Sequence, residues 1–232
     1  MELYTLLNNL TKIEGKKSWA ILEDRANLWM IVKHNKSLIN KERTGNRSFN
    51  CNPYQKKINF VRYTSIMDRI YRSGGLKIHG SGVKTRNGGY LFIGQSGAGK
   101  TTIIGLAGKD NLILDDDVII VVKDNARFVM FGPLFKKGNS TFPRLVTKQC
   151  ELKKIFILRK SNRNRAILLK PQDALVNIMK HSKWHYRLDT PEGKSFLKTC
   201  KELIKTVPAY ILEFLPTSGV WKYLDKEVKH FP

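Results

Sequence analysis

A glycine-rich segment, which lies between an apolar run and a helical pattern, constrains this chain more than any other feature. Residues 94–101 (GQSGAGKT) match G-x-x-x-x-G-K-[ST] at every fixed position. The apolar run of residues 90–93 precedes the segment, and a helical pattern over residues 101–107 follows it. Glycines let the backbone turn its N–H groups toward a phosphate. The order of strand, loop and helix therefore predicts a phosphate-binding loop within an α/β fold.

The residue types of this loop predict a nucleoside triphosphate as its ligand. Lys100 is expected to reach the terminal phosphates, and the hydroxyl of Thr101 to ligate Mg²⁺. We expect ATP, although the loop itself does not distinguish ATP from GTP. The predicted nucleotide-binding residues are Gly94, Gln95, Ser96, Gly97, Ala98, Gly99, Lys100, Thr101 and Thr102.

Three consecutive aspartates follow one element later. Residues 112–118 are LILDDDV, so an apolar strand ends in carboxylates. In a P-loop protein, one carboxylate at this point holds the metal, and a neighbour can take a proton from an attacking hydroxyl. The simpler alternative is a solvated acidic turn between strands. The gap from Lys100 to Asp115 is short, which favours a compact kinase-like protein over a motor or a switch GTPase.

These segments together resemble a known family. The ordered set is His79-Gly80 on a strand, then GQSGAGKTT, then LILDDDVIIV. It resembles the kinase domain of bacterial HPr kinase/phosphorylase and its shorter relatives, whose fold is similar to the C-terminal domain of phosphoenolpyruvate carboxykinase. The motif-level resemblance covers residues 76–122, with weaker echoes at FGPLF (131–135) and KKIFILRK (153–160). It implies ATP-dependent transfer of the γ-phosphoryl group to a hydroxyl, usually that of a serine in a protein or peptide.

The resemblance also implies roles for individual residues. By position in the motifs, Asp115 is the catalytic base, and Asp116 helps Thr101 to hold the metal. His79 matches the family histidine that precedes the loop and is expected to lie against the base carboxylate. A strand histidine with an ordinary structural role is the alternative. The predicted catalytic residues are Asp115, Lys100 and His79.

The chain departs from the family pattern at two places. Family kinases often carry a further glutamate beyond the aspartates, whereas Asp124 is the only acid between Asp117 and Glu151. The C-terminal signature of phosphorylase activity is not found. The sequence therefore supports neither phosphorolysis nor HPr itself as the substrate.

The chain is strongly basic, with a net charge of +23 from 42 Lys+Arg and 19 Asp+Glu. The surplus is concentrated in residues 125–170, where 12 Lys+Arg face only Glu151. An anionic acceptor is therefore expected, either an acidic peptide or protein or an RNA. We expect one arginine of this segment to neutralise charge in the transition state, the candidates being Arg144, Arg159, Arg163 and Arg165.

Four functions thus stay open. The first is a kinase that phosphorylates a serine of a protein or peptide. The second is a kinase that uses the same site on RNA or another nucleic acid, with residues 125–170 binding the acceptor. The third is a non-catalytic nucleotide-binding module, which the aspartates argue against. The fourth is a carboxykinase that acts on oxaloacetate, for which the chain looks too short.

The chain is expected to form two parts, a β-rich region over residues 1–63 and a P-loop kinase domain of α/β class over residues 64–232. The expected helices cover residues 64–72, 101–107, 171–179, 195–205 and 220–229. The expected strands cover residues 76–79, 90–93, 111–114, 118–122, 128–131, 153–158, 165–169 and 209–214, with a turn at 87–89.

Three distant cysteines, Cys51, Cys150 and Cys200, predict reduced thiols used for packing rather than a zinc site. The chain shows no signal peptide and no apolar run of membrane-spanning length, so we expect a cytoplasmic protein without a membrane partner. The sequence leaves the oligomeric state open, a homo-oligomer included.

Overall fold

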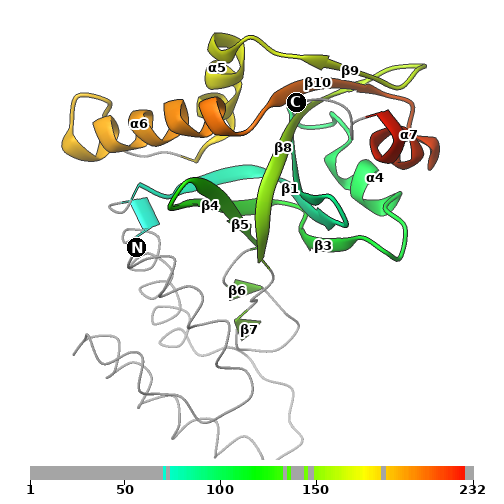
Figure 1. Ribbon diagram of the computed structural model, residues 1–232, viewed down its shortest axis with the longest axis horizontal. Helices are drawn as coiled ribbons and strands as arrows, with labels where there is room; N and C mark the ends of the chain where they lie inside the picture. The colour runs from blue at the N-terminus through cyan, green and yellow to red at the C-terminus, as the bar shows by residue number, and fades with distance from the viewer. Residues whose placement is uncertain are drawn as a thin grey trace, which may run out of the picture.

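The computed structural model describes residues 70–71, 74–132, 135–136, 144–145, 149–183 and 187–227 (Figure 1). The predicted β-rich region over residues 1–63 lies outside the described residues, as does Cys51. Of the helix expected over residues 64–72, only Ile70 and Tyr71 are described, and both are helical.

The described elements alternate between strands and helices along the chain. The strands are β1 (Leu76–Thr85), β2 (Gly88–Ile93), β3 (Leu112–Asp115), β4 (Val118–Asp124), β5 (Arg127–Phe131), β6 (Phe135–Lys136), β7 (Arg144–Leu145), β8 (Gln149–Lys160), β9 (Arg165–Leu168) and β10 (Ala209–Phe214). The helices are α4 (Lys100–Gly105), α5 (Pro171–His181), α6 (Pro191–Thr206) and α7 (Gly219–Glu227).

Eight of the described strands form one mixed sheet, in which most pairs are antiparallel. Strand β1 pairs with β2 on one side and with β3 and β4 on the other. Strand β8 pairs with β5 near its start and with β2 further along, which closes the circuit β1–β4–β5–β8–β2. The predicted α/β class therefore takes the form of a mixed sheet with helices packed on it. Most pairs of strands are antiparallel because hairpins, rather than helices, connect most of the neighbouring strands.

The parallel pairs of this sheet bring three strand ends to one edge. Strand β8 runs parallel to β2 and to β10, so the carboxyl ends of these three strands point the same way. The glycine-rich loop follows β2, and the connections after β8 and β10 leave from the same edge. In sheets with this arrangement, residues at the carboxyl ends of parallel strands meet.

Helices cover the sheet with two separate hydrophobic cores (Figure 1). Helices α5 and α6 supply Ala174, Ile178 and Phe196 to one core. Helices α4 and α7 supply Ile103 and Trp221 to the other. The second core contains a row of aromatic rings from three parallel strands, Phe92, Phe156 and Tyr210, with stacked neighbours 5.4 and 5.7 Å apart. Each such pair contributes about 0.5–1.5 kcal/mol beyond its burial.

Most of the predicted element positions are confirmed, and the differences have physical reasons. The aspartates interrupt a strand, with β3 before them and β4 after, and β10 has the predicted bounds. Strands β1 and β8 are longer than predicted because each pairs with different partners along its length. The predicted turn at residues 87–89 moves to residues 86–87, since the glycines that follow pair with β1.

The cysteines of the described residues are free thiols. Burial raises the pKa of both Cys150 and Cys200 to about 12, so both stay protonated near neutral pH. Both therefore act as apolar packing groups, as predicted. Within the described ranges, none of the helices combines the length and the apolar character needed to cross a bilayer.

Candidate functional site

The glycine-rich loop, residues 94–99, joins β2 to α4 through two glycines in the left-handed region. Gly97 has φ 77° and Gly99 has φ 101°, values that favour glycine. A Cβ on Gly99 would lie 2.6 Å from Cζ of Phe214, whereas one on Gly97 would meet nothing within 4 Å. The loop thus packs on β10 at Gly99 and leaves open space at Gly97. The two left-handed glycines fit the turn that the sequence pattern predicts, and phosphate binding by the loop stays a prediction.

The ammonium group of Lys100 lies folded into this loop. Its Nζ donates to the carbonyl oxygens of Gly94, at 2.8 Å, and Gln95, at 3.1 Å. The side chain is buried, and this desolvation lowers the pKa of Lys100, while the charge of Asp117 acts to raise it. Among the described residues no carboxylate forms an ion pair with it. A buried cation held only by carbonyl dipoles fits a site whose natural counter-charge is an anionic ligand.

Strand β1 joins the loop to the aspartates. Gly80 pairs with Ile93, the residue before the loop, and its N–H also donates to the carbonyl oxygen of Asp117 at 3.1 Å. The hydroxyl of Ser81 donates to the carbonyl oxygen of Asp116 at 3.2 Å. A single segment of β1 therefore fixes both halves of the predicted site, which lie 13 or more residues apart along the chain.

The three aspartates have different environments. Asp115 is 7% exposed, and its Oδ1 accepts hydrogen bonds from the backbone N–H of Asp117, at 2.8 Å, and Val118, at 3.1 Å. Its carboxylate therefore shapes the turn between β3 and β4. Asp116 and Asp117 are exposed at that turn.

His79 lies against Asp117, and the expected contact with Asp115 is corrected. The imidazole Nδ1 is 2.9 Å from Oδ1 of Asp117 and 3.0 Å from its carbonyl oxygen. The register explains the difference, because His79 is opposite Val118 whereas Asp115 is opposite Gly82, three positions along β1. The strand pairing thus selects the third aspartate as the partner of the histidine.

The predicted Mg²⁺ ligands, Thr101 and Asp116, are both exposed at this edge of the sheet. In the described part of the chain no three His, Cys, Asp or Glu side chains converge on one point. Mg²⁺ next to phosphates needs few protein ligands, since water and the phosphates supply the rest. One hydroxyl and one carboxylate beside the loop fit that requirement.

Sequence reasoning did not single out Lys160, which lies beside the loop. It is the last residue of β8, and a Cβ on Gly99 would lie 3.8 Å from its Cε. Its position beside the loop could not be predicted, because the sequence indicates that β8 is a strand but not that this strand runs parallel to β2. A basic residue at the end of a buried strand was the available signal.

The side chains of three of the four candidate arginines are described, and two of these three face one carboxylate. Arg159 and Arg163 have guanidinium nitrogens 3.6 and 3.8 Å from the carboxylate oxygens of Glu213. Arg165 is opposite Glu213 in the pairing of β9 with β10. The side chain of Arg144 lies outside the described residues.

Comparison with known families gives one assignment. A family model described as "ScmC: SynChlorMet cassette protein ScmC" matches residues 51–229. The chain belongs to the ScmC family. The matched range includes the glycine-rich loop, the aspartates and the three parallel strand ends, so the whole candidate site lies inside the residues that the family model matches.

Comparison with solved structures finds a distant similarity. The Hpr(Ser) kinase/phosphatase from Coxiella burnetii is similar over 66% of this chain and 95% of that chain, at 12% identity and a TM-score of 0.38. At this TM-score no functional assignment rests on the likeness. No curated protein matches the chain.

Proposed function

We propose that the protein is an ATP-dependent phosphotransferase that transfers the γ-phosphoryl group to a hydroxyl, that of a serine in a protein or peptide. The observation that carries the proposal is the buried ammonium of Lys100 inside a glycine loop that β1 ties to an aspartate turn. Phosphoryl transfer depends on positioning and charge stabilisation, and these are the two things this arrangement supplies.

The loop and its neighbours form the nucleotide side of the proposed site. Backbone N–H groups of the loop other than that of Ala98, which donates to the carbonyl oxygen of Gln95, would surround the phosphates. Lys100 would exchange its two carbonyl partners for phosphate oxygens. Thr101 and Asp116 would hold Mg²⁺, which neutralises charge on the phosphates when bound. Lys160 adds a second cation beside Gly99.

The acceptor side of the proposed site contains the base. Asp115 carries this role in the motif alignment, but its Oδ1 already accepts two backbone hydrogen bonds. Asp117 is exposed, contacts His79, and is the carboxylate whose charge acts on Lys100. We therefore assign the base role to Asp117, which would take the hydroxyl proton, and to His79 the task of orienting that carboxylate.

The test replaces each aspartate by asparagine and follows label from γ-labelled ATP into protein of a fractionated cell extract. We expect Asp117→Asn to lower the transfer rate by about a hundredfold or more. Asp115→Asn should transfer label at a rate close to that of the parent protein. Circular dichroism and nucleotide binding, measured on all variants, separate a catalytic loss from misfolding.

The opposite pattern, in which only Asp115→Asn loses transfer, would return the base role to Asp115. If the parent protein transfers no label to any fraction while it binds ATP, the non-catalytic nucleotide-binding module is the better description.

The basic charge of the chain favours one second candidate, a kinase that acts on RNA. The net charge of +23 exceeds what one nucleotide requires. The same label-transfer experiment decides between the two, because label then enters RNA and is released by ribonuclease rather than by protease.

A further inference from the structure

Two arginines contact one carboxylate near the ends of β8, β9 and β10, and a third arginine is opposite it in the strand pairing. Glu213 on β10 is opposite Arg159 on β8 and opposite Arg165 on β9. Residues that are opposite each other on adjacent strands point to the same face of the sheet. Arg159, Glu213 and Arg165 therefore form a row across three strands, and Arg163 joins it from the connection between β8 and β9. We call these four residues the arginine row.

The geometry leaves the guanidinium groups able to bind a further anion. The Glu213 side chain is 16% exposed, whereas those of Arg159 and Arg163 are 62% and 65% exposed. The ion-pair distances of 3.6 and 3.8 Å exceed hydrogen-bond length, so Glu213 holds the arginines in place without using their donors. Each guanidinium has several N–H donors. Three arginines against one glutamate leave a surplus of two positive charges.

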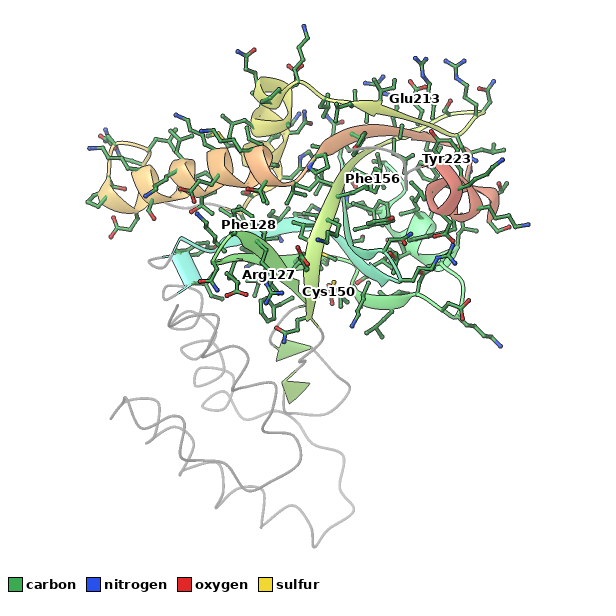
Figure 2. The ribbon with its side chains drawn as sticks, in the orientation of Figure 1. Arg127, Phe128, Cys150, Phe156, Glu213 and Tyr223 are labelled. Atoms are coloured by element: carbon green, nitrogen blue, oxygen red, sulfur yellow. The ribbon has the colours of Figure 1, made fainter. Side chains whose placement is uncertain are left out.

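The arginine row lies at the same sheet edge as the glycine-rich loop, because both are near the carboxyl ends of parallel strands, with β8 between β2 and β10. The row points to the opposite face from Phe214 and Lys160, the residues beside Gly99 of the loop, so a peptide that reaches both passes over the edge. Two strand spacings, about 10 Å, separate β2 from β10 laterally. An extended peptide covers that lateral distance with about three residues. Figure 2 shows Glu213 near the end of β10 that leads to α7.

We propose that the arginine row binds acidic side chains of the polypeptide acceptor and so delivers its serine to the loop. This inference rests on the proposed phosphotransferase function, because only that function makes the bound polypeptide an acceptor. The docking itself does not require catalysis. The ligand is a pair of carboxylates close together in an extended segment, about three residues from the serine.

Charge complementarity favours an acidic peptide over RNA at this place. A surplus of two positive charges matches two carboxylates, and guanidinium groups bind carboxylates through paired N–H donors. The peptide is recognised through its side chains rather than as an added strand, because the outer N–H of Ala166 on β9 already donates to the hydroxyl of Tyr223 at 2.8 Å.

The experiment measures binding of two fluorescein-labelled peptides by anisotropy in the absence of nucleotide. One peptide carries Asp-Asp three residues from a serine, and the other has Asn-Asn in its place. The test variant combines Arg163→Ala with Arg165→Ala. The control variant combines Lys201→Ala with Lys205→Ala, which removes the same charge from exposed positions on α6.

We expect the Asp-Asp peptide to bind the parent protein about tenfold more tightly than the Asn-Asn peptide. The arginine variant should lose this preference, while the lysine control keeps it. In turnover, the arginine variant should raise KM for the Asp-Asp peptide and not for the Asn-Asn peptide, a difference that a merely structural role of the row would not produce.

Equal binding of the two peptides, or an equal loss in both double variants, overturns the proposal. A single-stranded RNA of matched charge is tested as a competitor of the Asp-Asp peptide. If the RNA displaces the peptide, and this effect is lost only in the arginine variant, the row is assigned to RNA instead. A Lys100→Ala variant separates this proposal from the proposed function, since it should lose phosphoryl transfer and still bind the Asp-Asp peptide like the parent. Arginine-dependent binding without transfer by the parent protein would leave the docking site standing and refute the kinase.

Discussion

The imidazole Nδ1 of His79 lies 2.9 Å from Oδ1 of Asp117, a residue 38 positions away in the chain. The two side chains are 38% and 62% exposed. A polar contact this exposed contributes little to stability because water competes for both groups. Its effect is therefore to hold one carboxylate of the aspartate turn in a fixed direction.

Replacing His79 by glutamine should reduce phosphoryl transfer without reducing stability. The amide can still donate to Asp117 but sits on a longer and more flexible side chain than the imidazole ring, so the carboxylate is oriented less firmly. We expect the rate to fall about tenfold and the melting temperature to stay within about 2 °C of the parent value. A large drop in melting temperature with an unchanged specific rate would show that the contact is structural.

Asp115 is expected to matter for stability through its turn. Asp115→Ala removes the acceptor of two backbone N–H groups and should cost about 1–3 kcal/mol in the free energy of unfolding. Asp115→Asn keeps an oxygen at the Oδ1 position and should cost less than about 1 kcal/mol. Urea unfolding of the two variants checks the difference. Equal losses in both would mean that the charge of Asp115, and not its hydrogen bonding, stabilises the turn.

Gly80 has no room for a side chain because β1 and β2 are close there. A Cβ on Gly80 would lie 2.7 Å from the carbonyl oxygen of Phe92, so Gly80→Ala should destabilise the fold by about 1–3 kcal/mol. Gly105→Ala is the matched control, since a Cβ there meets nothing within 4 Å and helix α4 should gain up to about 1 kcal/mol. Opposite shifts in melting temperature are expected, and a neutral Gly80→Ala would contradict the strand pairing.

Lys100→Met should separate stability from nucleotide binding. Burial lowers the pKa of Lys100 from its ordinary value of 10.5, so the folded state binds this proton less firmly than the unfolded state. At pH values below the folded-state pKa of Lys100, folding therefore carries the full free-energy cost of burying this charge. The free energy of unfolding then rises as the pH approaches 10.5. Methionine has no such cost, so its stability gain should be largest near neutral pH and shrink as the pH rises toward 10.5.

The same variant should bind ATP about tenfold more weakly or worse, because it loses the cation that faces the phosphates. Isothermal calorimetry measures this directly. ATP affinity equal to the parent's would remove Lys100 from the proposed nucleotide site.

Lys160 is expected to support nucleotide binding from the neighbouring strand. Lys160→Ala should weaken ATP binding about three- to tenfold, with a smaller effect at high salt. Lys153→Ala is the control on the same strand, at the other end of the β2–β8 pair, where its Nζ lies 2.6 Å from Oε1 of Glu151. Equal effects of the two replacements on ATP binding would mean that Lys160 acts only as part of the general basic charge of the chain.

Local patterns in the sequence determine the individual elements. The glycine-rich loop, the strand that stops at the aspartates and resumes after them, and the bounds of β10 all follow from residues close together in the chain. Such features depend on backbone preference and on alternation of apolar residues, which neighbouring residues decide. The Asp115 and His79 assignments are local in the same sense, because each rests on a position within a motif.

Only the tertiary structure decides which of these residues meet. The register of β1 with β4 directs His79 to Asp117, and the parallel pairing of β8 with β2 brings Lys160 to the loop. Pairing of β10 with two neighbours gathers the arginines around Glu213. A register shift of one residue would turn each of these side chains to the opposite face. The sequence by itself determines the chemical groups and the loop, and long-range strand pairing determines the site that they form.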